Sequence, residues 1–230
     1  MKQRVTSQGK NKLMNVNELK VKGIFLDLDG TVVNSKSAYI EAAKIAFKAL
    51  GQKSPENKVA LEIPKRLEQG LTISDIMNGD TKKFLKIYYQ TFYSISHEKT
   101  KLIPNVSATL EILSQKAKLA LITMRHAPTQ EIMKELESFG ISKYFTCVVT
   151  AMDARPKPSP EALIKCVEAL DVEMCSCIIA GDSVNDIRAG KAAGAGTVAV
   201  LSGLYLCEEL IKEGPDLILN DVTALPGYIK

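Results

Sequence analysis

The stretch from Gly23 to Asn34 constrains the fold of this chain more than any other. It begins with an apolar run, a pattern that predicts a β-strand buried on both faces, and that run stops before Gly30, a residue that ends strands. Asp27 and Asp29 stand where the predicted strand runs out. Two acidic side chains at the end of a core strand are costly to bury unless a cation or a proton compensates them. The stretch therefore predicts a site of polar chemistry built on a buried strand.

Beyond residue 102, predicted helices and strands alternate along the chain. The predicted strands cover 119–122, 147–149, 177–180 and 197–200, with 216–219 as an edge strand. The predicted helices cover 105–115, 129–139, 160–170 and 185–193. This alternation is typical of a parallel sheet with helices on both faces. We therefore expect an α/β fold of the Rossmann-like kind.

The region from 36 to 101 has the pattern of helices and no strand pattern. Helices are expected over 38–50, which Gly51 ends, and over 81–95, whose aromatic stripe indicates a packed core. Pro64 is expected to interrupt the segment between them, so that Lys65 and Arg66 lie in a basic turn. The predicted domains are a mobile arm over 1–20, a core formed by 21–35 and 102–230, and an inserted helical cap over 36–101.

Polar side chains follow the later predicted strands. They are Thr123 after the strand 119–122, Lys157 in the proline-rich loop after 147–149, and Asp182 and Asp186 after 177–180. Open parallel sheets bind ligands at the carboxyl ends of their strands, so we expect these groups to meet Asp27 and Asp29. Taken singly, each residue has an ordinary structural role, such as a helix cap or a solvated lysine. Their succession at strand ends indicates one site.

The motif from Asp27 to Val32, followed by these groups in the same order, resembles the motifs of the haloacid dehalogenase superfamily, most of whose members are phosphatases. The resemblance extends from the first strand through the later strand ends. It implies that Asp27 is the nucleophile that becomes an aspartyl phosphate, and that Asp29 is first the general acid and then the base. Thr123 would hydrogen-bond the phosphoryl oxygens. Lys157 would offset charge on the phosphoryl group and on the attacking carboxylate.

The same resemblance implies Mg²⁺ as the cofactor, a hard cation suited to carboxylates, waters and a phosphate oxygen. Its ligands would be the carboxylates of Asp27 and Asp182 and the backbone carbonyl of Asp29, with Asp186 binding directly or through water. The dehalogenases of the superfamily attack carbon and as a group lack the second aspartate, so Asp29 favours phosphorus chemistry. The resemblance is to phosphoglycolate phosphatases, and it implies a small phosphorylated anionic metabolite as substrate.

Two other functions are compatible with the same motifs. A sugar phosphomutase of the β-phosphoglucomutase type shares the motifs and the cap, and it would isomerise its substrate rather than release phosphate. A non-catalytic regulatory protein that binds phosphate on the same fold is the second alternative. Loss of Asp27 or Asp29 would have favoured it, and both are present.

The distribution of charge suggests where an anionic substrate binds. Residues 36–101 contain 12 basic and 7 acidic residues, whereas 14–35 and 102–230 together contain 14 basic and 19 acidic ones. A basic insertion above an acidic body suits an anion held between them. Lys65 and Arg66 are therefore candidate substrate-binding residues, with a solvated basic turn as the alternative. Arg125 and His126, close behind Thr123, either contact the substrate or face solvent.

The same sequence argues against nucleic-acid and membrane partners. Residues 1–13 carry four basic residues and no aromatic one, a weak basis for binding nucleic acid. No apolar run approaches the length of a membrane span, and no segment near the start resembles a secretion signal. We expect a cytoplasmic enzyme that acts on a small metabolite as a monomer or homodimer.

Overall fold

The computed structural model describes residues 19–230, so all but the last two residues of the predicted arm lie outside the described residues. Leu19 forms a β-bridge with Ile229, and its backbone N–H donates to the carbonyl of Tyr228 over 2.7 Å. The end of the predicted arm is therefore attached to the C-terminal segment.

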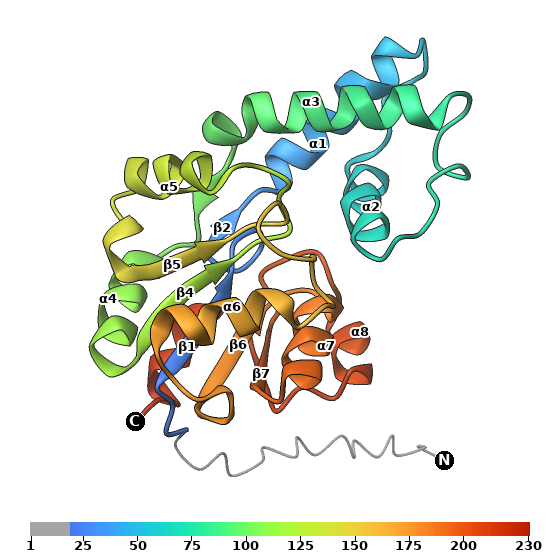
Figure 1. Cartoon of the computed structure of the whole chain (residues 1–230). Helices are drawn as coiled ribbons and strands as arrows, with labels where there is room; N and C mark the ends of the chain where they lie inside the picture. The colour runs from blue at the N-terminus through green and yellow to red at the C-terminus, as the bar shows by residue number, and fades with distance from the viewer. Residues whose placement is uncertain (1–18) are drawn as a thin grey trace, which may run out of the picture.

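Six parallel strands form the central sheet, in the order β5–β4–β1–β6–β7–β8 (Figure 1). Their bounds are β1 Gly23–Asp27, β4 Lys118–Ile122, β5 Phe145–Val149, β6 Cys177–Gly181, β7 Gly196–Val200 and β8 Leu217–Leu219. From β1 the chain builds outward first through β4 and β5 and then, on the other side, through β6 to β8. The strand order thus reverses at β1, and in open parallel sheets such a reversal marks a ligand-binding crevice. The predicted α/β fold class, including β8 as an edge strand, is confirmed.

Helices cover both faces of the sheet because successive side chains of β1 point to opposite sides. Ile24 and Leu26 pack in one hydrophobic cluster with α4 and α5, whereas Phe25 packs in another with α6 and α7. All five residues of β1 are buried, as expected for a central strand. The helices of the core are α4 Val106–Lys116, α5 Thr129–Ser138, α6 Glu161–Leu170, α7 Val184–Ala193 and α8 Cys207–Lys212, with short 3-10 helices at Ser142–Tyr144, Met174–Ser176 and Val222–Gly227.

Three further helices, which we call the helical insertion, follow the first strand and lie beyond one end of the sheet (Figure 1). They are α1 Lys36–Ala49, α2 Asn57–Glu68 and α3 Thr81–Lys99. Their apolar faces form a hydrophobic cluster of their own, in which Phe47, Phe84 and Tyr88 pack together. A role for the insertion as a substrate cap stays a prediction. No helix within residues 19–230 has the length and apolar character needed to cross a bilayer.

Two short strands that the sequence analysis missed join the insertion to the core. β2 (Val33–Asn34) pairs antiparallel with β3 (Lys101–Leu102), so the chain leaves and re-enters the core through adjacent strands. Two-residue strands carry too little periodicity to be seen in a sequence.

The predicted break at Pro64 is wrong, because α2 continues through this residue to Glu68. A proline inside a helix removes one backbone hydrogen bond. Ile63 and Pro64 are both buried, and the burial of their apolar surface offsets that loss. Lys65 and Arg66 therefore lie in the last turn of a helix, where basic side chains interact favourably with the helix dipole.

Candidate active site

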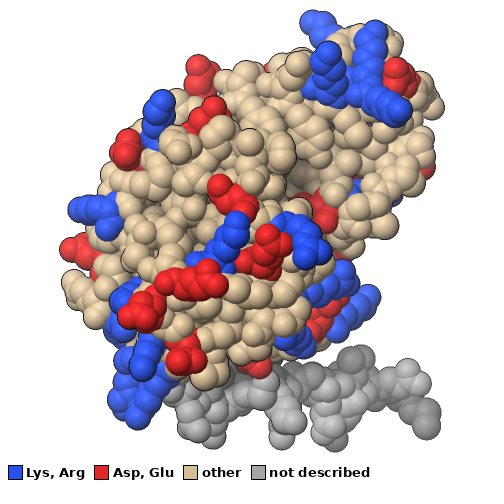
Figure 2. Space-filling view, in the orientation of Figure 1, with Lys and Arg blue, Asp and Glu red and all other residues tan. Residues whose placement is uncertain are grey.

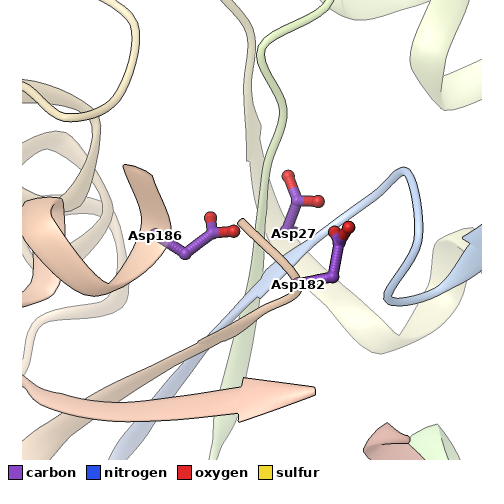
Figure 3. Close-up of side chains that lie close together, drawn as sticks. All are labelled: Asp27, Asp182 and Asp186. Carbon is purple, nitrogen blue, oxygen red and sulfur yellow. The ribbon is translucent and has the colours of Figure 1, made fainter. Parts of the chain in front are cut away.

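Three carboxylates converge at the carboxyl ends of β1 and β6 (Figure 3). Asp27 is the last residue of β1, Asp182 directly follows β6, and Asp186 reaches toward them from the first turn of α7. One oxygen of each lies within 4.8 Å of the others, and all three residues are buried. The structure thus brings together the three acidic side chains that the sequence placed after two separate strands.

Lys157 is the cation of this cluster. Its Nζ donates to Asp27 Oδ1 over 2.6 Å and to Asp186 Oδ1 over 2.5 Å, and its side chain is 1% exposed. Burial alone would lower the pKa of Lys157, but Asp186 and Asp27 raise it above its usual value. The ammonium therefore stays charged and holds the two carboxylates in place.

Glycines allow the chain to approach Asp182 closely. Gly30 has a φ of +88°, and a Cβ there would lie 2.6 Å from the Asp182 carboxyl group. A Cβ on Gly203 would overlap the same carboxyl group at 1.6 Å. The Leu204 N–H then donates to Asp182 Oδ2 over 2.9 Å. Two loops distant in sequence thus fix this carboxylate, and any side chain larger than glycine would displace it.

The electrostatics of the cluster favour an additional cation. Burial raises the pKa of Asp27 well above its usual value, and although Lys157 lowers it, Asp186 and Asp182 raise it further. Burial likewise raises the pKa of Asp182, with Glu68 and Asp186 adding to the effect. Three ionised carboxylates beside one lysine leave two negative charges uncompensated. An all-oxygen donor set with that deficit fits a hard divalent cation such as Mg²⁺.

Asp29 does not point at this cluster but is bound by Arg125. The Arg125 guanidinium donates to both Asp29 oxygens, over 2.8 Å from Nε and 2.7 Å from Nη2. Its Nη1 donates to Glu135 Oε2 over 2.5 Å, and the Ser35 hydroxyl donates to Asp29 Oδ1. Arg125 is 5% exposed, so this is a buried charge network. Burial alone would lower the pKa of Arg125, but Asp29 raises it above its usual value. Arg125 therefore lies inside the site, whereas His126 is exposed.

Thr123 lies directly after β4 and is buried beside the end of β1, where Ile122 is in register with Asp27. Its backbone N–H donates to the carbonyl of Val149 over 3.0 Å, and its hydroxyl accepts from the N–H of Arg125 over 3.1 Å. Within residues 19–230 the Thr123 hydroxyl donates no hydrogen bond. The backbone around the strand ends thus fixes Thr123 and Arg125 relative to each other.

A cavity of about 130 Å³ lies above Asp27 and Asp29, and the side chains that close it come from the helical insertion. In the space-filling view a hollow separates the insertion from the core, and several Lys and Arg side chains gather at the outer end of the insertion (Figure 2). Glu68, at the end of α2, is one of the lining residues. Burial, followed by the charges of Asp27 and Asp186, raises its pKa to about 8.

Glu68 also binds the insertion to the core. Ser183 and Tyr205 donate their hydroxyls to its Oε2 over 3.2 and 3.3 Å, and its carbonyl accepts from the Asn185 side chain over 2.8 Å. The sequence analysis missed Glu68, because a single acid at the end of a basic segment resembles an ordinary surface residue.

The structure does not place Lys65 or Arg66 in the cavity. Lys65 Nζ donates to Glu209 Oε2 over 2.7 Å, and Arg66 Nη1 donates to both oxygens of Asp75 over 2.6 and 2.8 Å. Neither residue lines the cavity above Asp27. The expectation that a turn would project both side chains toward the substrate does not fit, because α2 is a continuous helix that turns these residues away.

Comparisons with known proteins agree with this geometry. The family model described as haloacid dehalogenase-like hydrolase matches residues 24–200. The phosphoglycolate phosphatase of Vibrio parahaemolyticus is 33% identical over 218 residues, covering 89% of this chain and 94% of that protein. The phosphoglycolate phosphatase of Escherichia coli strain K12 is 28% identical over 230 residues, with 89% and 91% covered.

A solved structure shows the same fold. The haloacid dehalogenase-like family hydrolase from Streptococcus pneumoniae superposes with a TM-score of 0.77 at 22% identity, covering 91% of this chain and 98% of that one. The similarity thus extends over the sheet and the insertion together. From the family match and the relatives that span nearly its whole length, the chain belongs to the haloacid dehalogenase-like hydrolases, in the branch that contains the phosphoglycolate phosphatases.

Proposed function

We propose that this protein is a Mg²⁺-dependent phosphatase that hydrolyses a small phosphomonoester through an aspartyl phosphate on Asp27. The observation that carries the proposal is the state of the Asp27 carboxylate. Its Oδ1 accepts from Lys157, whereas its Oδ2 accepts no hydrogen bond from residues 19–230, and the residue lines the cavity. A carboxylate fixed by one oxygen and available through the other is suited to attack phosphorus.

In the proposed reaction, Asp27 Oδ2 forms a bond to phosphorus as the bond between phosphorus and the alcohol oxygen breaks. Asp29 gives its proton to the departing alcohol. A water molecule then attacks the aspartyl phosphate and passes a proton to Asp29, which releases inorganic phosphate and restores Asp27. Thr123 donates to a phosphoryl oxygen, and Lys157 compensates the charge on the phosphoryl group and on Asp27.

Arg125 is the substrate-binding residue of this proposal. In the structure its guanidinium makes a bidentate contact with Asp29. A phosphoryl group offers oxygens that suit the same planar fork of donors. We infer that the incoming phosphate draws the guanidinium from Asp29, which leaves Asp29 free to act on the departing alcohol. Glu135 retains the Arg125 side chain during this shift.

The residues that would hold Mg²⁺ are Asp27, Asp182 and Asp186, together with the backbone carbonyl of Asp29. Their oxygen donors and the excess negative charge of the cluster support this assignment. When bound, the ion would neutralise charge on the phosphoryl oxygens.

The names of the relatives make 2-phosphoglycolate the first substrate to test. Phosphate release from it and from a panel of phosphorylated metabolites is measured with Mg²⁺, for the wild type and for Asp27→Asn. The variant keeps the shape of the side chain and loses its attacking charge, so it should retain the fold, checked by circular dichroism, and release no phosphate. Asp75→Asn, at an exposed loop of the insertion, is the matched control. Activity of Asp27→Asn within a few-fold of wild type would refute the covalent mechanism. Isomerised product without phosphate release would instead indicate a mutase.

A further inference from the structure

The cavity above Asp27 has an aromatic wall. Tyr39 of α1 and Tyr88 and Phe92 of α3 line it. Tyr39 stacks on Phe92, with ring centroids 4.7 Å apart and an interplanar angle of 6°, so contacts within the protein hold the wall in place. A fixed aromatic surface of this kind suits a ligand with a ring or another flat apolar face.

Two polar groups of the same cavity have unused hydrogen-bonding capacity. Tyr88 is 1% exposed, and its hydroxyl has no partner among residues 19–230. Glu68 accepts the Ser183 and Tyr205 hydroxyls through Oε2, whereas its Oε1 accepts no hydrogen bond in the described part of the chain. A buried hydroxyl without a partner is destabilising, so such a group calls for an explanation such as a ligand. The unused groups are a hydroxyl, which can donate or accept, and a carboxylate oxygen.

The cavity has no cation for a second negative charge. Arg125 is the one basic residue among the described residues that line it, and its donors already bind Asp29 and Glu135. In the proposed reaction Arg125 turns to the phosphoryl group. Lys65 and Arg66 are held by Glu209 and Asp75 outside the cavity. A carboxylate on the leaving group, as in phosphoglycolate, would therefore enter the cavity without a basic partner among the lining residues.

We propose that Glu68 and Tyr88 determine the specificity of this enzyme, and that they select phosphate esters of neutral, hydroxyl-bearing ring alcohols over phosphoglycolate. The inference rests on the proposed phosphatase activity and names its substrate class. Glu68 Oε1 accepts a hydrogen bond from a hydroxyl of the leaving group, Tyr88 Oη binds a second hydroxyl, and the aromatic wall contacts the ring face. Buried polar groups reject a ligand that leaves them unpaired, which gives them their discriminating power.

The test compares kcat/KM for three esters: glucose 6-phosphate, 2-phosphoglycolate and p-nitrophenyl phosphate. The first offers a neutral ring with hydroxyls, the second an anionic group, and the third a ring without hydrogen-bond donors. Wild-type enzyme should prefer glucose 6-phosphate to 2-phosphoglycolate by about tenfold or more.

Two conservative variants test the assigned residues. Tyr88→Phe should lose roughly three- to tenfold more in kcat/KM on glucose 6-phosphate than on p-nitrophenyl phosphate, and its Tm should not fall, because the lost hydroxyl has no partner in the protein. Glu68→Gln should reduce the ratio of kcat/KM for glucose 6-phosphate to that for 2-phosphoglycolate by roughly ten- to a hundredfold, since the new amide can donate a hydrogen bond to a substrate carboxylate. The matched controls are Tyr144→Phe and Glu168→Gln, which do not line the cavity and should leave every ratio unchanged.

The outcomes separate this inference from the proposed function. Hydrolysis of p-nitrophenyl phosphate or 2-phosphoglycolate, with no preference for glucose 6-phosphate, would overturn the inference and leave the phosphatase assignment in place. Equal losses on all three esters in both variants would also overturn it, because they would give Glu68 and Tyr88 a structural role only. If the wild type hydrolyses none of the three with Mg²⁺, both proposals fail.

Discussion

Replacement of Lys157 by methionine tests whether one buried cation holds the acidic cluster together. Methionine keeps most of the length of the side chain and removes its charge. The ammonium lies 2.6 Å from Asp27 Oδ1 and 2.5 Å from Asp186 Oδ1, with its side chain 1% exposed. Removing one partner of a buried ion pair typically costs about 3–5 kcal/mol, and here two carboxylates lose their partner, so we expect about 5 kcal/mol. For a chain of this size the loss corresponds to a fall in Tm of about 10–20 °C.

The loss of stability in Lys157→Met should be larger at high pH than at low pH. Lys157 lowers the pKa of Asp27, which burial raises, so its removal raises that pKa further. The folded variant therefore takes up protons that the unfolded chain does not hold, and its stability rises as the pH falls. The difference in Tm between wild type and Lys157→Met should be largest near pH 8 and smaller near pH 5.

Thermal unfolding followed by circular dichroism, with and without Mg²⁺, measures the effect. Mg²⁺ should restore part of the Tm, because it supplies the missing positive charge, while kcat should stay roughly a hundred- to a thousandfold below wild type through loss of a charge-stabilising donor. Lys82→Met, an exposed lysine on α3, is the control and should leave both quantities unchanged. A loss below about 1 kcal/mol, or one that does not change with pH, would refute the view that Lys157 compensates the cluster.

Three further predictions follow from the same geometry. Asp29→Asn should slow hydrolysis of alkyl phosphates far more than that of aryl phosphates, whose leaving group needs no proton, and equal losses would assign Asp29 a structural role. In the presence of a chelator, the protein should lose stability as pH rises, because burial raises the pKa of Asp27, Asp182 and Glu68, the last from 4.5 to about 8. An acid whose pKa is higher in the folded state contributes stability below its unfolded pKa, and that stability is lost as pH rises through the folded pKa. Glu68→Gln should therefore flatten the dependence of Tm on pH between about pH 4.5 and 8. An equally steep dependence in the variant would exclude Glu68 as a cause. Arg66→Ala should change neither Tm nor kcat/KM on any ester beyond experimental error, because the ion pair of Arg66 with Asp75 is exposed. A loss of kcat/KM confined to an anionic substrate would instead show that Arg66 binds the substrate.

The sequence by itself determined the sheet and the residues at its strand ends. The short apolar run before Asp27 favours a buried strand, and alternation with helices is typical of parallel strands; the structure has both. Parallel strands present their carboxyl ends at one edge, so Thr123 and Asp182, which directly follow β4 and β6, lie at the same edge as Asp27, whereas Lys157 reaches it through the loop after β5. These positions follow from local periodicity and chain order, which a sequence displays directly. The chemical roles assigned to them stay predictions.

Tertiary structure alone decided what surrounds that edge. The bond between Arg125 and Asp29 joins residues 96 positions apart, and the bond between Glu68 and Ser183 joins residues 115 positions apart. The first bond depends on how two loops of the core meet, and the second on how the helical insertion packs against the core. The same packing turns Lys65 and Arg66 toward Glu209 and Asp75, although their sequence context suggested the cavity. The number of charges along a segment does not tell where each side chain points, because a helix distributes consecutive residues around all of its faces. Which face meets the substrate is determined by the elements that pack against the helix.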